Sequence, residues 1–315
     1  MWLINRLAKK YMIAEGHPIS SNVPLLAHPL AKRAWRVIEL ILYVVIILIF
    51  IVPFLWMFFG SLRDESEIFA NLYPFSWKTI FPIQWTLKNY LDIFGISEEG
   101  RGFGLQFQRF LFNSALVSAG VVACSIIFNT MGAYFFARLD FPFKNVLLIF
   151  VIATMLVPFQ ATIVPLYIVV SSLNIHNSYA GLILPWYASP FVIFALMQFM
   201  KDIPKDLDEA AIIDGASYFS ILRHIIVPLT IPGSITMALL EFQFIWDLFY
   251  WPLIVISDPK LQMIQVAIAT QTTQNETFWG RTFAGSVVAS LPVIILFLAL
   301  QKYYVQGIAI TGVKG

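Results

Sequence analysis

Long apolar stretches alternate with short polar segments along most of this chain of 315 residues. Six of the stretches reach the ~20 residues that a helix needs to cross a bilayer at ~1.5 Å rise per residue. The pattern therefore predicts an all-α, polytopic membrane protein with six transmembrane helices. We expect these helices at Val37–Gly60, Phe110–Phe136, Val146–Val170, Tyr179–Met200, Ile225–Ile256 and Thr282–Tyr304.

The composition supports a membrane protein. Hydrophobic residues make up 59% of the chain and charged residues 12%, whereas soluble domains carry about 25% charged residues. The single cysteine, Cys124, lies in an apolar stretch and supplies neither an intrachain disulfide nor a multi-cysteine metal site. The first apolar stretch is too long for a signal peptide and lacks a cleavage site, so we expect it to remain as a signal anchor.

The distribution of lysine and arginine predicts the orientation, because cytoplasmic loops are enriched in both. With both termini in the cytoplasm, the inner segments hold thirteen of the twenty Lys and Arg residues. Five of the other seven lie in one long loop, where the rule is weak. We therefore expect a multi-pass protein of the inner (cytoplasmic) membrane. The thirteen residues are Arg6, Lys9, Lys10, Lys32, Arg33, Arg36, Arg138, Lys144, Lys201, Lys205, Arg223, Lys302 and Lys314.

The predicted spans divide the chain into five parts. Residues 1–36 form a cytoplasmic N-terminal extension and 37–60 the first transmembrane helix, followed by an extracytoplasmic loop at 61–109. Residues 110–304 form a core of five helices that includes an inner loop at 201–228, and 305–315 form a cytoplasmic tail. Prolines interrupt most spans, either as ordinary kinks or as breaks around a solute path.

The inner loop at 201–228 contains a short predicted helix. A proline precedes an acidic first turn, where the positive end of the helix dipole favours carboxylates, and Gly215 suits the end of the helix. Such a helix fits a groove on a partner, with Glu209 available to an arginine there. The alternative is a solvated amphipathic loop. The residues of the helix and of the turn before it include Pro204, Asp206, Asp208, Glu209, Ala210 and Ala211.

The spacing within this loop resembles the EAA signature of ABC importer permeases. Glu209-Ala210-Ala211 is followed after three residues by Gly215, and after nine more by Ile225-x-Val227-Pro228, with Val227 where leucine is usual. The resemblance implies a type I ABC importer permease fold and a loop that docks in a cleft of an ATPase subunit. The implied coupling residues are Asp208, Glu209, Ala210, Ala211, Asp214, Gly215, Ala216 and Pro228.

Other motifs are similar to the carbohydrate, maltose-type branch of this family, and within it to the smaller permease subunit. Asp247 stands in one of these motifs where asparagine is usual, so its role is open. The resemblance implies that the tail residues Gly312, Val313, Lys314 and Gly315 face the ATPase. The motifs are Asn113-Ser114, the stretch 133–142, Met155-Leu156-Val157-Pro158, the stretch 163–167, Trp246-Asp247, Trp251-Pro252-Leu253 and the C-terminal stretch 301–315.

The resemblance implies a permease subunit that forms half of the pathway for a sugar, oligosaccharide or related polar solute. The implied partners are a second homologous permease in a heterodimer, two ATPase subunits, an extracytoplasmic solute-binding protein and membrane lipid, with no nucleic acid. The sequence contains no GxxxxGK[ST] loop. We therefore expect ATP and magnesium at the partner ATPase, and no catalytic residue, metal or cofactor on this chain.

Polar residues at membrane depth are costly and mark candidate pathway positions. The candidates are Gln160, Gln198, Glu241, Gln243 and Asp247. Glu241 also suits a buried hydrogen bond between helices. One alternative is an ion-gradient-driven secondary transporter that uses Glu241 or Asp247, although the chain shows no internal repeat. Another is an intramembrane enzyme, for which the sequence offers no nucleophile–base pair and no metal-ligand spacing.

Overall fold

A computed structural model describes residues 29–73, 76–271 and 277–312. Most of the expected N-terminal extension and the tail residues Val313, Lys314 and Gly315 lie outside the described residues. The chain divides into two compact units, residues 1–59 and 60–315, and each is considered by itself.

The first unit consists, in its described part, of the helix α2 (Pro29–Ser61), whose last two residues belong to the second unit. Its apolar segment Trp35–Ser61 is long enough to cross a membrane and confirms the expected first helix. Most of its side chains are apolar and exposed on every side. A helix that is hydrophobic all round is typical of a membrane span.

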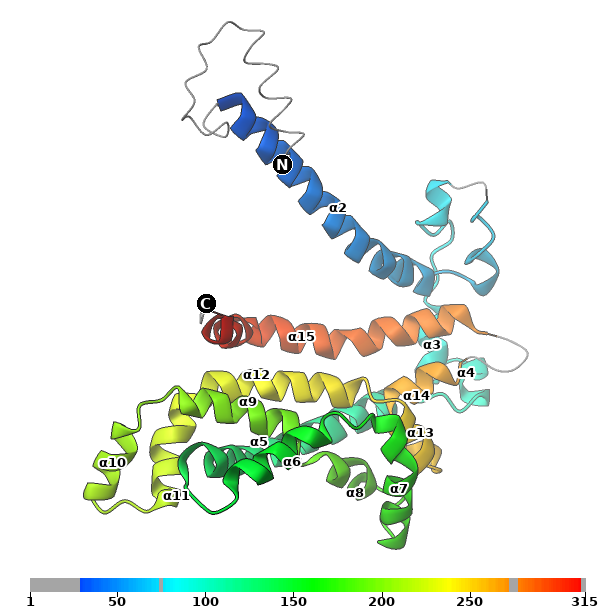
Figure 1. Cartoon of the computed structure of the whole chain (residues 1–315). Coiled ribbons are helices and arrows are strands. Elements are labelled where there is room, and N and C mark those ends of the chain that lie inside the picture. The colour runs from blue at the N-terminus through cyan, green and yellow to red at the C-terminus, as the bar shows by residue number, and fades with distance from the viewer. Residues whose placement is uncertain (1–28, 74–75, 272–276, 313–315) are drawn as a thin grey trace, which may run out of the picture. The chain divides into compact units, whose positions relative to one another are not determined.

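The second unit contains three further helices that are long and apolar enough to cross a membrane on their own. They are α5 (Phe107–Arg138), the continuous helical stretch Tyr218–Trp246, and the apolar part of α15 (Trp279–Gly312). α5 packs against both α9 (Pro190–Lys201) and α12 (Val227–Trp246), and α12 packs in turn against α15 (Figure 1). The described part of this unit is thus a layered bundle of helices.

Two expected spans are each broken into a bent pair of helices. α6 (Lys144–Thr154) and α7 (Phe159–Ser172) meet at 100°, and Tyr179–Trp186 meets α9 at 44°. The spans expected at Val146–Val170 and Tyr179–Met200 are therefore present as broken helices, so that here the prolines mark breaks and not ordinary kinks. Pro158 directly precedes α7 and Pro190 is the first residue of α9, because proline lacks the N–H that an unbroken helix requires. Counting each bent pair as one span gives the expected six within the described residues.

The fifth expected span also differs from the prediction at Ile225–Ile256. The helix begins earlier, at Tyr218, and ends at Trp246, and Tyr250–Val255 forms a separate short helix, α13. Asp247 caps the end of α12. The remaining short elements are η2 (Glu65–Glu67), η3 (Trp77–Thr79), α3 (Lys88–Ile93), α4 (Glu98–Gly102), α8 (Tyr179–Ile183), η4 (Leu184–Trp186), α10 (Asp206–Ile213), α11 (Tyr218–Ile221), the π-helical turn η5 (Leu222–Ile226), η6 (Pro259–Leu261) and α14 (Ile264–Ala269).

Polar side chains at membrane depth hold the break before α9. Asn129 of α5 is fully buried, accepts a hydrogen bond from the Ser189 backbone N–H at 3.0 Å and donates to the Ser125 hydroxyl at 2.6 Å. Ser189 in turn caps the backbone N–H of Val192. Backbone groups freed by a helix break need such partners where no water is present.

Candidate functional site

The short helix in the inner loop is present as the sequence predicted. α10 runs from Asp206 to Ile213, its first turn contains the three acidic residues, and Lys205 precedes it. Gly215 has a φ of +80°, a conformation in which an L side chain is strained. The N–H groups of Gly215 and Ala216 donate to the carbonyls of Ile212 and Ala211, both at 2.9 Å. These two bonds form a Schellman motif, which ends the helix sharply.

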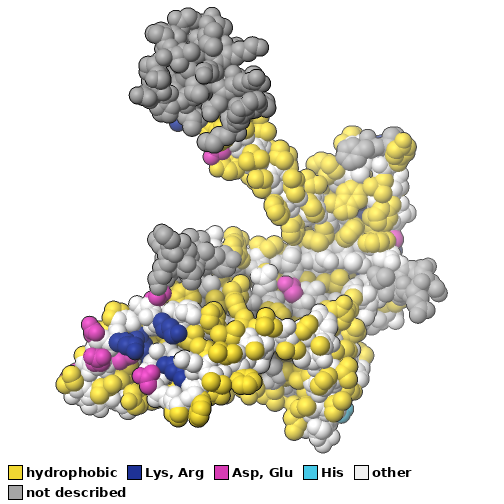
Figure 2. All heavy atoms as spheres, in the orientation of Figure 1, with side chains coloured by type: hydrophobic (Ala, Val, Ile, Leu, Met, Phe, Trp, Pro, Cys, Tyr) yellow, Lys and Arg dark blue, Asp and Glu magenta, His cyan; other side chains and the backbone are white. Residues whose placement is uncertain are grey.

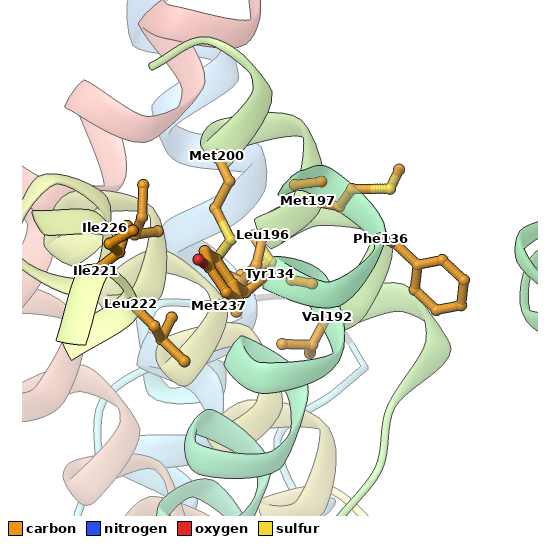
Figure 3. Close-up of a cluster of buried hydrophobic side chains, with 12 residues drawn as sticks. Tyr134, Phe136, Val192, Leu196, Met197, Met200, Ile221, Leu222, Ile226 and Met237 are labelled. Carbon is orange, nitrogen blue, oxygen red and sulfur yellow. The ribbon is translucent and has the colours of Figure 1, made fainter. Parts of the chain in front are cut away.

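A hydrophobic cluster supports α10 from within the bundle. Ala211, Ala216 and Ile203 pack against buried side chains of α5, α9, α11, η5 and α12. In Figure 3, Tyr134, Leu196, Met200 and Met237 meet in the middle of this cluster, with Ile221, Leu222 and Ile226 beside them. The small alanine side chains let α10 approach this core closely.

A buried ion pair fixes the same helix to the end of α5. The Arg138 Nε lies 3.3 Å from Asp208 Oδ2, and the two side chains are 3% and 14% exposed. Arg138 Nη2 also donates to the Ile203 carbonyl oxygen at 2.8 Å. Arg138 thus contacts both the segment before α10 and its first turn. Asp208 faces the body of the protein, whereas Glu209 and Ala210 are exposed.

Five apolar side chains of α10 and α11 are exposed, which the sequence analysis did not anticipate. Ile213 is 86% exposed, although isoleucine is usually buried. Charged side chains gather at this end of the bundle, while its flanks are largely hydrophobic (Figure 2). Exposed apolar patches with polar rims mark interaction sites. We call this surface the inner patch; it consists of Leu207, Ile212, Ile213, Tyr218 and Phe219.

The inner loop continues into α12 through an unusual turn. Leu222–Ile226 forms a π-helical turn, in which the N–H of Val227 donates to the Leu222 carbonyl. Pro228 follows in the first turn of α12, where its missing N–H costs nothing. Single π-helical turns occur frequently at functional sites.

The five candidate pathway residues lie on α7, α9 and the end of α12. Gln160 and Gln198 are exposed, and Glu241 is buried. The Asp247 N–H donates to the Gln243 carbonyl at 3.0 Å, which is the backbone bond that ends α12 and not a contact between the two side chains. Gln265 of α14, which sequence analysis missed, donates to Asp247 Oδ1 at 3.4 Å.

Two of the hollows among the described residues of the second unit are lined by none of the candidate pathway residues. One of about 500 Å³ lies at the start of α6, and one of about 440 Å³ lies between α5 and the helices α11 and α12. Within the residues that the structure describes, no group of three His, Cys, Asp or Glu side chains is arranged to hold a metal ion.

Comparisons with known proteins agree with these features. Residues 129–310 match the family described as binding-protein-dependent transport system inner membrane component. The chain is 30% identical to the arabinooligosaccharides transport system permease protein AraQ of Bacillus subtilis, over 92% of this chain and 100% of that protein. It is also 30% identical to the trehalose/maltose transport system permease protein MalG of Thermococcus litoralis, over 90% of this chain and 98% of that protein.

A solved structure shows the same fold. It is the crystal structure of a bacterial ABC transporter involved in the import of the acidic polysaccharide alginate, with a TM-score of 0.73 and 19% identity over 91% of this chain and 100% of that chain. The resemblance that the EAA-like loop suggested is thereby confirmed, and the chain belongs to the family of binding-protein-dependent transport system inner membrane components.

Proposed function

We propose that this protein is one permease subunit of an ATP-driven ABC importer and forms half of the path for a sugar, oligosaccharide or related polar solute. The solute class is supported by the relatives, whose names give arabinooligosaccharides, trehalose and maltose. The observation that carries the coupling role is α10, which is fixed to the bundle on one side and presents the inner patch on the other.

In the proposed mechanism, α10 docks in a cleft of an ATPase subunit. Leu207, Ile212 and Ile213 supply apolar contact area, and the exposed Glu209 carboxylate is available to an arginine of that cleft. Asp208 positions the helix through Arg138 rather than contacting the partner. When the ATPase subunits close on ATP and magnesium, α10 moves with them and the bundle changes between inward-facing and outward-facing states.

Two connections lead from α10 into the bundle. The Arg138–Asp208 pair leads to α5, and the π-helical turn at Leu222–Ile226 leads to α12. Because α5 and α12 pack directly against each other, a displacement of α10 reaches both helices. Coupling of this kind requires a contiguous set of packed elements with two arrangements.

The proposed assembly contains a second, homologous permease, two ATPase subunits and an extracytoplasmic solute-binding protein. We place both termini in the cytoplasm, on the side of α10, with the tail Gly312–Gly315 towards the ATPase. The charge distribution along the sequence supports this orientation.

Replacement of Glu209 by lysine and of Gly215 by valine tests the proposal. The complex is reconstituted in liposomes with ATP, and solute uptake and co-purification of the ATPase are measured. We expect both variants to lose uptake, because the first reverses a contact charge and the second strains the end of α10. Asp140→Asn is the matched control, since Asp140 forms an exposed ion pair at the same end of the bundle.

Two results would argue against the proposal. Normal uptake together with normal ATPase co-purification in both variants would show that α10 is not the coupling element. Uptake driven by a proton or sodium gradient without ATP would instead favour the secondary transporter.

A further inference from the structure

A closed loop follows the first span. The Thr86 N–H donates to the Leu62 carbonyl at 2.9 Å and joins the two ends of the loop. The Arg63 guanidinium is buried and donates to the carbonyls of Lys78 and Thr79 at 3.2 and 3.0 Å. The carboxylate of Glu67 accepts from the N–H groups of Ile83 and Gln84 at 2.6 and 3.3 Å. Residues 62–86, apart from 74 and 75, therefore form a fixed structure, which we call the aromatic loop.

The base of the aromatic loop lies at the ends of two spans. The first span ends at Ser61, whose carbonyl accepts from Asn89 Nδ2 at 3.0 Å. The last span begins at Trp279, where the Glu65 carboxylate accepts from the N–H groups of Trp279 and Gly280 at 2.8 and 2.9 Å. Because the ends of apolar spans lie at the bilayer surface, the base of the aromatic loop lies at that surface too.

Aromatic side chains dominate the exposed part of this loop. Tyr73 is 95% exposed and Trp77 63% exposed, and both belong to the described part of the loop. The carboxylates near the base are occupied by backbone N–H groups: Asp64 at Ser66, Glu65 at α15 and Glu67 at Ile83. The acidic side chains near the base are thus hydrogen-bonded within the protein, and the loop exposes amphipathic aromatic rings. Further exposed apolar side chains are Phe69, Leu72, Phe81, Ile83 and Trp85.

We propose that the aromatic loop lies in the headgroup layer of the extracytoplasmic leaflet and contacts lipid. Tyrosine and tryptophan combine an apolar ring with a polar tip and are enriched at this depth of the bilayer. The loop directly follows the first span in the chain and is hydrogen-bonded to the start of the last span at its base. Through the contacts of Glu65 with the start of α15, lipid at the loop also fixes the depth of that helix. The proposal rests on the membrane location and on the orientation given under the proposed function, and not on the solute or the ATPase.

Site-specific labelling tests the position of the loop. In a Cys124→Ala background, Tyr73→Cys is labelled with bimane and the assembled complex is reconstituted in liposomes. Quenching is measured with phosphatidylcholine that carries a doxyl group near the headgroup and with aqueous iodide. We expect lipid quenching several-fold greater than at the control, Glu98→Cys on α4, and several-fold less quenching by iodide. Trp77→Cys is measured in the same way, so that the result does not depend on one site.

The other outcomes overturn the proposal. Strong iodide quenching without lipid quenching at Tyr73 and Trp77 would show that the loop stands in water. Protection from both quenchers would show that protein covers the loop, in which case it is an interface with the second permease. Protection that appears only after the binding protein is added, from a state open to iodide, would make the loop a docking surface for that protein.

Discussion

The Arg138 guanidinium lies 3.3 Å from the Asp208 carboxylate, at the junction of α5 with α10. Both side chains are almost completely removed from solvent, and Arg138 also donates to the carbonyl of Ile203. One long helix of the bundle is thus joined directly to the short helix that carries the inner patch. This relationship explains why Asp208 of the EAA-like loop does not face outwards.

Removal of one member of this ion pair should lower the stability of the protein. Arg138→Met leaves the Asp208 carboxylate buried without its counter-charge, which typically costs about 3–5 kcal/mol. We expect a clear decrease in the thermal unfolding midpoint of the purified protein and a loss of ATP-dependent uptake. Lys144→Gln is the control, because its partner Asp140 is 92% exposed and such pairs contribute about 0–1 kcal/mol. Equal effects of the two variants would contradict the structure.

The double variant Arg138→Met with Asp208→Leu separates stability from coupling. Replacement of both charges by apolar groups removes the unpaired carboxylate, so the double variant should be more stable than Arg138→Met alone. If uptake nevertheless remains low, the pair positions α10 for coupling. Full recovery of both stability and uptake would show that the pair serves stability only.

The contact of α9 with α12 depends on a glycine. A Cβ at Gly233 would lie 2.8 Å from ring atoms of Phe199, which is too close for the two helices to keep their spacing. We expect Gly233→Ala to destabilise the protein by about 1–3 kcal/mol in thermal or chemical unfolding. Gly102→Ala is the control, because a Cβ at Gly102 would meet nothing within 4 Å. A neutral Gly233→Ala would mean that the helices do not pack in this way.

The segment that contains α4 should respond to acid through Glu99. Partial burial acts to raise the pKa of this carboxyl, but the hydrogen bond and charge of Arg281, with Lys88 nearby, outweigh it and hold the pKa below its ordinary value. A lowered folded-state pKa stabilises the fold above the ordinary value, and this contribution disappears as pH falls through the lowered pKa.

We therefore expect the unfolding midpoint of the unaltered protein to decrease more steeply below about pH 4.5 than that of Glu99→Gln. Glu98→Gln is the matched control, since Glu98 is the exposed neighbour on the same helix. Parallel pH profiles for the unaltered protein and Glu99→Gln would contradict the ion pair with Arg281.

Neutral replacements of the two acidic pathway candidates distinguish the proposed importer from an ion-driven transporter. Asp247→Asn keeps the oxygen that accepts from Gln265, and such exposed changes typically alter free energies by about 0.5 kcal/mol, or roughly twofold. We expect ATP-driven uptake to persist in Asp247→Asn and in Glu241→Gln. Loss of uptake in either variant, with intact ATPase coupling, would show that the replaced carboxylate takes part in transport.

Local chemistry was sufficient to predict α10. Acidic residues favour the first turn of a helix, and glycine favours the position just after its last turn. The structure has Asp206, Asp208 and Glu209 in the first turn of α10 and Gly215 just after it. Helix breaks were not predictable in the same way. Pro158 directly precedes a new helix, whereas Pro165, Pro232 and Pro292 lie inside helices. The difference depends on whether neighbouring helices satisfy the freed carbonyl, which a single sequence does not show.

Contacts between distant parts of the chain could also not be predicted from the sequence. Arg138 and Asp208 lie on different helices, and no spacing rule connects them. The exposure of Ile212, Ile213, Tyr218 and Phe219 was not predicted for a different reason: a sequence with helical propensity does not show which side of a short helix the bundle covers. Their exposure depends on how α10 and α11 lie on the core of the bundle.

The π-helical turn at Leu222–Ile226 gives the start of α12 a position at which the helix could rotate about its own axis. Successive residues of an α-helix are rotated by about 100°. Taking up or releasing a single residue in the wide turn would therefore rotate Tyr218 and Phe219 by about that angle about the axis of α12. In the coupling proposed above, a displacement of α10 would in this way rotate α12 about its axis without unwinding it.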